Sequence, residues 1–344
     1  MKINRNDLQA AVTNGLLSDD QLEQLWAFLA ERQRDKPGFN FIHILYYLGG
    51  LIAISAMTLF MTLGWESFGG WGIFFIALAY AGAGLWLTHY FLSQPHLKIP
   101  AGITGTFVVA LTPLAVYGLQ TALGFWAEGY VYRDYHVWID WRWLLMELAT
   151  LATGAVMLWR YRLPFLVMPV AVTLWYMSMD LAPFLAGGED LDWAWRKLVS
   201  LWFGLLMVLL ALWVDIRSRP EQDYAFWLYL FGVIAFWGGL SLMKSDSELG
   251  KLLYFGINLF MIFVGAVLSR RVFAVFGGLG GAGYLGYLAY HVFEDSLLFP
   301  FVLTLIGLGV IYLGILWQRR EQAISARLQS WLPAAWREWL AQRY

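Results

Sequence analysis

Residues 272–293 read VFAVFGGLGGAGYLGYLAYHVF, and this stretch contains no aspartate, glutamate, lysine or arginine. At a rise of about 1.5 Å per residue, a helix of this length crosses the roughly 30 Å hydrocarbon core of a lipid bilayer. The stretch therefore predicts a membrane-spanning helix. Its six glycines predict that part of the surface of this helix is smooth enough for close packing.

Nine other apolar stretches of similar length occur along the chain. They cover residues 42–63, 72–92, 101–123, 142–159, 165–186, 198–214, 225–243, 252–268 and 297–317. In lipid every backbone N–H and C=O needs a partner within the protein, and long continuous apolar runs meet this need as helices. The sequence predicts an all-α, polytopic membrane helix bundle with about ten transmembrane helices over residues 41–317.

The composition fits a membrane domain, because 60% of the 344 residues are hydrophobic and 14% are charged. An ordinary soluble domain has roughly 25% charged residues. Cysteine is absent, which excludes disulfides, thiolate metal sites and cysteine nucleophiles. The sequence also lacks the zinc motif HExxH, the nucleophile motif GxSxG and a glycine-rich phosphate loop. We therefore predict no metal, no cofactor and no catalytic residue from these motifs.

The distribution of lysine and arginine predicts the orientation, since both residues are enriched in the cytoplasmic loops of membrane proteins. If the N-terminus is cytoplasmic, the inner segments contain 17 of the 23 basic residues and the outer loops contain six. We therefore expect both termini in the cytoplasm.

The N-terminal region, residues 1–40, is predicted to be a cytoplasmic pair of short helices with a break at Asn14 and Gly15. Ser18 followed by Gln21 fits a capping box at the start of the second helix. A helix pair of this size cannot bury its own apolar faces. We expect residues 4–34 to dock on the membrane domain, on a second copy of the chain or on a partner protein.

The C-terminal region, residues 318–344, contains five arginines together with leucines and tryptophans. This pattern is typical of a basic amphipathic segment that lies on an anionic cytoplasmic leaflet. We expect its partner to be the lipid bilayer, because binding to nucleic acid requires more positive charge than this segment has.

The N-terminal quarter of the chain resembles a known family. Residues 15–25 read GLLSDDQLEQL, and they are followed by YYLGGLIAISAMTLF at 46–60 and GWE at 64–66. These stretches look like a bacterial family of multi-pass inner-membrane proteins with a domain of unknown function. The resemblance covers about the first 90 residues and implies a cytoplasmic N-terminal helix pair, but it implies no activity.

Small residues follow a four-residue spacing in the stretch 272–293, at Gly278, Ala282 and Gly286, with Gly277 and Gly281 on an adjacent strip. This spacing lets two helix backbones approach closely and predicts that the face packs directly against another helix. The alternative is that the glycines mark a helix that bends or unwinds where a substrate passes.

Ionisable residues inside predicted spans are costly and indicate function by default. The candidates are Glu147, Asp180 and His291, with Asn258 as a neutral companion. All four lie toward the outer ends of their predicted helices. We predict that they line one polar cavity that opens to the periplasm.

A purely structural role is the alternative for the two acids in this set. Glu147 and Asp180 could form ion pairs at the membrane interface with nearby basic residues, which are Arg142, Arg196 and Lys197.

The favoured function is a carrier for a small molecule or ion, because ten spans divide into five and five, as in inverted-repeat transporters. Pro113 also interrupts the predicted span 101–123. One alternative is an accessory protein that acts through its N-terminal helices and the small-residue face. Another is an acyltransferase-like membrane enzyme, on a distant similarity of Asn258 and His291 to the Asn and His of such enzymes.

Overall fold

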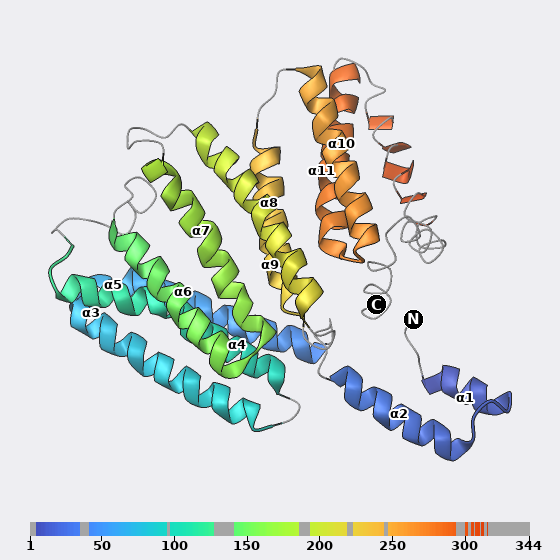
Figure 1. Cartoon of the computed structure of the whole chain (residues 1–344), viewed down its shortest axis with the longest axis horizontal. Helices are drawn as coiled ribbons and strands as arrows, with labels where there is room; N and C mark the ends of the chain where they lie inside the picture. Colours follow the sequence, from blue (N-terminus) through green and yellow to red (C-terminus); the bar gives the residue numbers. More distant parts are fainter. Residues whose placement is uncertain are drawn as a thin grey trace. The chain divides into compact units, whose positions relative to one another are not determined.

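The computed structural model describes residues 5–34, 41–94, 97–126, 141–185, 193–218, 223–243 and 247–293, and positions 300, 301, 304, 305, 307–309, 311, 312 and 315. Within these ranges the chain forms eleven α-helices and one short 3-10 helix (Figure 1). The all-α prediction is therefore confirmed. The chain divides into two compact units, a first unit of residues 1–169 and a second unit of residues 170–344.

The N-terminal helix pair consists of α1 (Arg5–Thr13) and α2 (Asp19–Arg34). Gly15 takes a positive φ of 70° in the break between them. The backbone N–H of Ser18 donates to Oε1 of Gln21 at 3.0 Å, and the backbone N–H of Gln21 donates to Oγ of Ser18 at 3.3 Å. The predicted capping box and the predicted break are both confirmed.

The first two predicted spans form the halves of α3 (Phe41–Leu92), which meet at Gly69. Gly69 has φ 62° and ψ 174°, a backbone conformation that glycine adopts without steric cost. Met57 of the first half packs in the same apolar cluster as Ile73 and Ala77 of the second half. Both halves therefore contribute side chains to one apolar cluster.

The third predicted span is divided into α4 (Lys98–Ala110) and α5 (Thr112–Ala122). Pro113 lies in the first turn of α5, where its missing N–H costs no helical hydrogen bond. The prediction that this proline interrupts the span is confirmed, and the two short helices together remain long enough to cross a membrane.

The first unit packs these helices closely. A Cβ atom on Gly70 of α3 or on Gly118 of α5 overlaps the backbone of the other helix, so glycine at both positions permits the contact. The hydroxyl groups of Thr88 and Thr104 lie 2.9 Å apart between α3 and α4. Helix α6 (Trp141–Tyr161) and the 3-10 helix η2 (Pro164–Leu166) complete this unit.

The second unit contains the remaining described helices. They are α7 (Val167–Leu185), which starts at the boundary of the units, α8 (Trp193–Arg217), α9 (Ala225–Ser241), α10 (Glu248–Val267) and α11 (Arg271–Phe293). Helices α8 and α9 form one hairpin, and α10 and α11 form another (Figure 1).

Among the described residues, five helical segments are long and apolar enough to cross a membrane, and they cover residues 68–92, 98–122, 195–217, 248–267 and 271–291. Two shorter apolar helices, 44–57 and 225–241, coincide with two more predicted spans. Helices α6 and α7 coincide with another two. By length and composition, the chain is a multi-pass membrane protein.

Two predicted segments lie largely or wholly outside the described residues. The span 297–317 is described only at isolated helical positions between 300 and 315, and the basic tail 318–344 is not described.

Candidate functional site

The turn between α10 and α11 determines where Arg270 points. Helix α10 ends at Val267 with Leu268 as its C-cap, Ser269 takes a positive φ of 55°, and the N–H of Arg270 donates to the carbonyl of Gly265 at 3.0 Å. This is the hydrogen bond of a Schellman cap, in which a residue in the left-handed region reverses the chain at a helix end. The cap places Arg270 directly before the first residue of α11.

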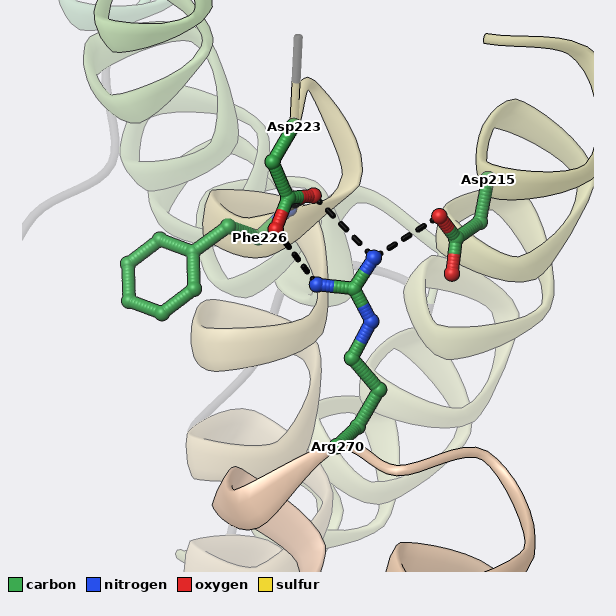
Figure 2. A network of polar contacts seen from close by, with 4 residues as sticks. All are labelled: Asp215, Asp223, Phe226 and Arg270. Carbon is green, nitrogen blue, oxygen red and sulfur yellow. Dashed lines mark hydrogen bonds and ion pairs between the residues drawn. The ribbon is translucent and has the colours of Figure 1, made fainter. Parts of the chain in front are cut away.

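The guanidinium group of Arg270 bridges two aspartates that come from different helices (Figure 2). It contacts Asp223, just before α9, through both of its terminal nitrogens, at 2.5 Å and 3.1 Å. One of these nitrogens also donates to Asp215, near the end of α8, at 2.8 Å. We call these three residues the Arg270 cluster. It ties the end of α8, the start of α9 and the α10–α11 turn together.

Burial differs sharply within the Arg270 cluster. The side chain of Asp215 is 1% exposed and that of Arg270 is 10% exposed, whereas that of Asp223 is 44% exposed. Asp223 also accepts a hydrogen bond from the backbone N–H of Phe226 at 3.1 Å, which caps the start of α9. The guanidinium carbon of Arg270 lies 5.2 Å from the ring centroid of Tyr229, which adds a cation–π contact.

The three residues of the Arg270 cluster are not among the site residues predicted from the sequence. The signal was present, because Asp215 is the only acid in the apolar run 198–217 and Arg270 lies between two predicted spans. Basic residues between predicted spans indicate orientation and acids contribute little to it, so this signal did not single out the three residues. Their pairing could not be read from the sequence, since 55 residues separate Asp215 from Arg270.

Asn258 is fully buried, at the contact between α9, α10 and α11. Its side-chain oxygen accepts from the indole N–H of Trp237 at 3.1 Å, and its amide nitrogen donates to the carbonyl of Tyr254 at 2.8 Å. Gly280 of α11 lies against the amide group, where any side chain overlaps it. These contacts give Asn258 a packing role within the second unit.

His291 lies at the opposite end of the α10–α11 hairpin from Arg270 and is exposed. Its ring stacks on Tyr287 with 5.7 Å between centroids. Lys251 donates to the hydroxyl of Tyr287 at 2.5 Å and to Glu248 at 2.7 Å. The structure therefore places His291 in an exposed polar group with these three residues.

Glu147 lies in α6, in the first unit, and its side chain is buried with 8% exposure. The next residue toward the N-terminus, Met146, belongs to an apolar cluster with Leu111 and Leu114. The hydrogen bond from Nε2 of Gln120 to the carbonyl of Arg142, at 3.1 Å, fixes the start of α6 beside α5. A buried carboxyl group is thus held on a helix whose first turn is bonded to α5.

Asp180 lies on α7, in the second unit, and is half-buried. The indole N–H of Trp175 on this helix donates to Ser200 of α8 at 3.3 Å. Since consecutive helices run in opposite directions, Asp180 lies at about the level of Trp195 and Arg196 on α8. The predicted cavity takes Glu147 from one unit and three residues from the other, so it stays a prediction.

The glycines of α11 have two different surroundings. Gly277 and Gly280 lie against α10, where a Cβ atom overlaps the backbone or side chain of Asn258. A Cβ atom at Gly278 or Gly286 meets no atom within 4 Å among the described residues. The face formed by Gly278, Ala282 and Gly286 therefore does not contact α10, and its packing against another helix stays a prediction.

The described part of the chain holds no group of three histidine, aspartate or glutamate side chains that could bind a metal ion. No protein-family model, no curated protein and no solved structure matches the chain. The resemblance to a bacterial inner-membrane family therefore rests only on the residues quoted for it.

Proposed function

We propose that this protein is a multi-pass carrier of the bacterial inner membrane, with ten spans and both termini in the cytoplasm. The asymmetry of lysine and arginine between alternate loops supports this orientation. In this proposal residues 1–40 form a cytoplasmic helix pair, residues 41–317 the membrane domain, and residues 318–344 a tail on the lipid surface.

The burial of Glu147 carries the proposal. Its carboxyl group is shielded on an apolar helix that we assign to the membrane. Burial disfavours the charged form of a carboxyl group, so such a group can take up and release a proton when its surroundings change. Intramembrane acids of this kind carry protons in pumps and transporters. Glu147 is therefore our choice for the titrating group.

The experiment compares two glutamates with opposite surroundings. In purified protein, infrared difference spectra between about pH 4 and pH 10 record carboxyl groups that titrate in this range. Glu147→Gln should remove one carboxyl band, whereas Glu248→Gln, which changes a largely exposed acid, should leave that band in place. A spectrum that is the same with and without Glu147 would contradict the assignment.

A transport assay tests whether this titration is used. Proteoliposomes loaded with a pH-sensitive dye are exposed to a panel of small solutes, and solute-dependent acidification of the interior is recorded. Glu147→Gln should abolish any such signal, and Glu248→Gln should retain it. The amide keeps the shape of the carboxyl group, so an unchanged melting temperature separates a loss of transport from a loss of folding.

A second candidate is an accessory protein that acts through α1 and α2. Leu8 and Leu22 are buried in this helix pair, but Leu16, Leu25 and Phe28 are exposed. If the exposed side chains mediate self-association, Phe28→Ser should reduce the mass of the full-length protein in detergent, measured by light scattering. No contact of Asn258 or His291 favours the acyltransferase alternative over these two.

A further inference from the structure

Three helix ends of the first unit meet at one apolar cluster. The cluster combines side chains from the end of α3, the start of α4 and the end of α6, namely Phe91, Leu92, Ala101, Leu158 and Tyr161. A Cβ atom on Gly102 of α4 would also overlap the side chain of Phe165, four residues after the end of α6. The start of α4 is therefore packed closely against the segment that follows α6.

Basic side chains gather where these helix ends meet. Lys98 is the first residue of α4, Arg160 lies in the last turn of α6, and Arg162 directly follows that helix. All three are exposed. Residues 67–127 and 148–179, which include all three helix ends, contain no aspartate or glutamate. These segments therefore contribute positive charge and no negative charge. We call Lys98, Arg160 and Arg162 the basic patch.

Lys98 occupies a position that the helix dipole disfavours. The N-terminus of a helix carries a partial positive charge, so an acid is stabilised there and a lysine is not. The N-cap residue, Leu97, has no side-chain oxygen to accept a hydrogen bond from the first N–H groups of α4. Both features favour an anion at the start of α4.

Arg162 has a backbone conformation that glycine adopts more easily. Its φ is 53°, and its N–H donates to the carbonyl of Leu158 at 2.9 Å, which is the hydrogen bond of an αL cap. A Cβ atom at such a position carries a steric cost that glycine avoids. The turn after α6 therefore does not require arginine, and the charge of Arg162 needs another explanation.

The exposed face of α6 next to Arg160 is apolar and suits contact with lipid. Trp159 is 77% exposed, and Val156, about one turn earlier, is 61% exposed. Tryptophan is enriched where a membrane protein meets the lipid headgroups. If α6 crosses the membrane, Arg160 lies at the level of the lipid phosphates and Val156 at the level of the acyl chains.

We propose that the basic patch binds an anionic phospholipid, with the phosphate held between the start of α4 and the end of α6 and an acyl chain along the exposed face of α6. Basic pockets between membrane helices suit such headgroups. The adjoining apolar face favours a lipid over a soluble anion. The proposal depends on the location of α4 and α6 in the membrane, but not on carrier activity or on proton binding by Glu147.

Native mass spectrometry of the full-length protein measures this binding, because it resolves each bound lipid by its mass. The protein in detergent is titrated with dioleoyl-phosphatidylglycerol or dioleoyl-phosphatidylcholine, which share their acyl chains and differ in net charge. Phosphatidylglycerol should bind more tightly, and its affinity should fall as the salt concentration rises. Equal affinities for the two lipids would overturn the proposal. Displacement of phosphatidylglycerol by inorganic phosphate at the same concentration would overturn the choice of a lipid.

Single substitutions locate the site. Lys98→Gln and Arg160→Gln should each lower the affinity for phosphatidylglycerol about fivefold, which is the contribution of one basic residue near an anionic lipid surface. The matched controls are Arg217→Gln and Arg271→Gln, which remove exposed arginines within two residues of the Arg270 cluster and should have a smaller effect. Equal losses in the two sets would show that the lipid binds to positive charge anywhere on the protein, which overturns the site.

Arg162 separates lipid binding from folding. Arg162→Gly relieves the left-handed backbone, so the melting temperature in detergent should not fall, while the affinity for phosphatidylglycerol should fall about fivefold. Arg162→Lys keeps the charge and should retain most of the affinity. An Arg162→Gly variant that binds as tightly as the natural chain would overturn the role of this arginine. Glu147→Gln should leave lipid binding unchanged, so a failure of this proposal is distinguishable from a failure of the proposed function.

Discussion

The two ends of the α10–α11 hairpin carry charged groups that look alike in sequence but differ in structure. At the turn, Arg270 contacts aspartates that are 47 and 55 residues away in the sequence and lies almost entirely out of water. At the open end, Lys251 pairs with Glu248 one helical turn away, and that glutamate side chain is 72% exposed. The Arg270 cluster joins three helix ends, whereas the contacts of Lys251 lie within the α10–α11 hairpin.

The difference shows that burial and sequence separation decide what a charged residue contributes. An exposed pair within one helix is weakened by water and salt. A buried arginine that satisfies two acids is costly to desolvate, but removing it leaves an uncompensated charge in the protein. The Arg270 end should therefore tolerate far less change than the Lys251 end. Five experiments test this contrast.

The largest expected effect concerns which side of the membrane each end faces. Alkaline phosphatase is active only outside the cytoplasm, so a fusion after Gly188 should be active and a fusion after Arg219 inactive. In the sequence Gly188 precedes α8 and Arg219 follows it, and the last turns of α8 contain Asp215 of the Arg270 cluster. The reverse result would place the Arg270 cluster in the periplasm and remove the proposed orientation.

Removal of the buried arginine should have the largest effect on stability. Arg270→Met leaves Asp215 buried without its arginine, which costs about 3 to 5 kcal/mol, and the melting temperature in detergent should fall accordingly. Arg271→Met is the matched control, because Arg271 is exposed in the next position. Its cost should stay within about 0.5 kcal/mol. Equal losses for the two variants would contradict the structural importance of the cluster.

An intermediate effect is expected at the middle of the hairpin. Gly280→Leu forces a side chain into the buried amide of Asn258, and overpacking of this kind costs about 1 to 3 kcal/mol. Gly283→Leu should cost little, because a Cβ atom there meets no described atom within 4 Å.

The same thermal assay tests the predicted face of Gly278 and Gly286. A double substitution of both glycines by leucine should lower the melting temperature if this face packs against another helix. An unchanged value would show that it faces lipid.

The smallest effect is expected at the exposed end. Lys251→Met removes the contacts with Glu248 and Tyr287, which are open to water, so the melting temperature should change less than in any variant of the Arg270 cluster. The remaining difference should disappear in about 1 M salt, where the screening length falls to roughly 3 Å. A large loss that persists at high salt would place Lys251 in a buried environment.

Local features of the fold could be predicted from the sequence because their causes lie within a few residues. The capping box of Ser18 and Gln21 and the break at Pro113 depend on hydrogen bonds to neighbouring backbone atoms. The apolar runs likewise predicted the helices, since lipid leaves the backbone no other way to satisfy its polar groups. In the part of the chain that the structure describes, five helical segments have the length and hydropathy that a membrane crossing requires.

The candidate site could be predicted only as a list of costly residues. Asn258 was selected because it is a polar residue in an apolar run. The run does not show that Trp237 and Gly280 enclose its side chain. The glycine spacing predicted close packing on α11, but could not indicate which of two adjacent strips faces α10. Helical periodicity gives the relative directions of side chains on one helix, not the neighbour that each direction meets.

The sequence by itself determined that this protein is an all-α membrane protein, because the length and apolarity of each segment are properties of the sequence alone. The tertiary structure decided which charged residues are structural. Arg270 acquires its role from a left-handed residue, Ser269, and from two aspartates on helices that fold back beside it. Such a role depends on distances between segments far apart in the chain, and those distances exist only after the helices have packed.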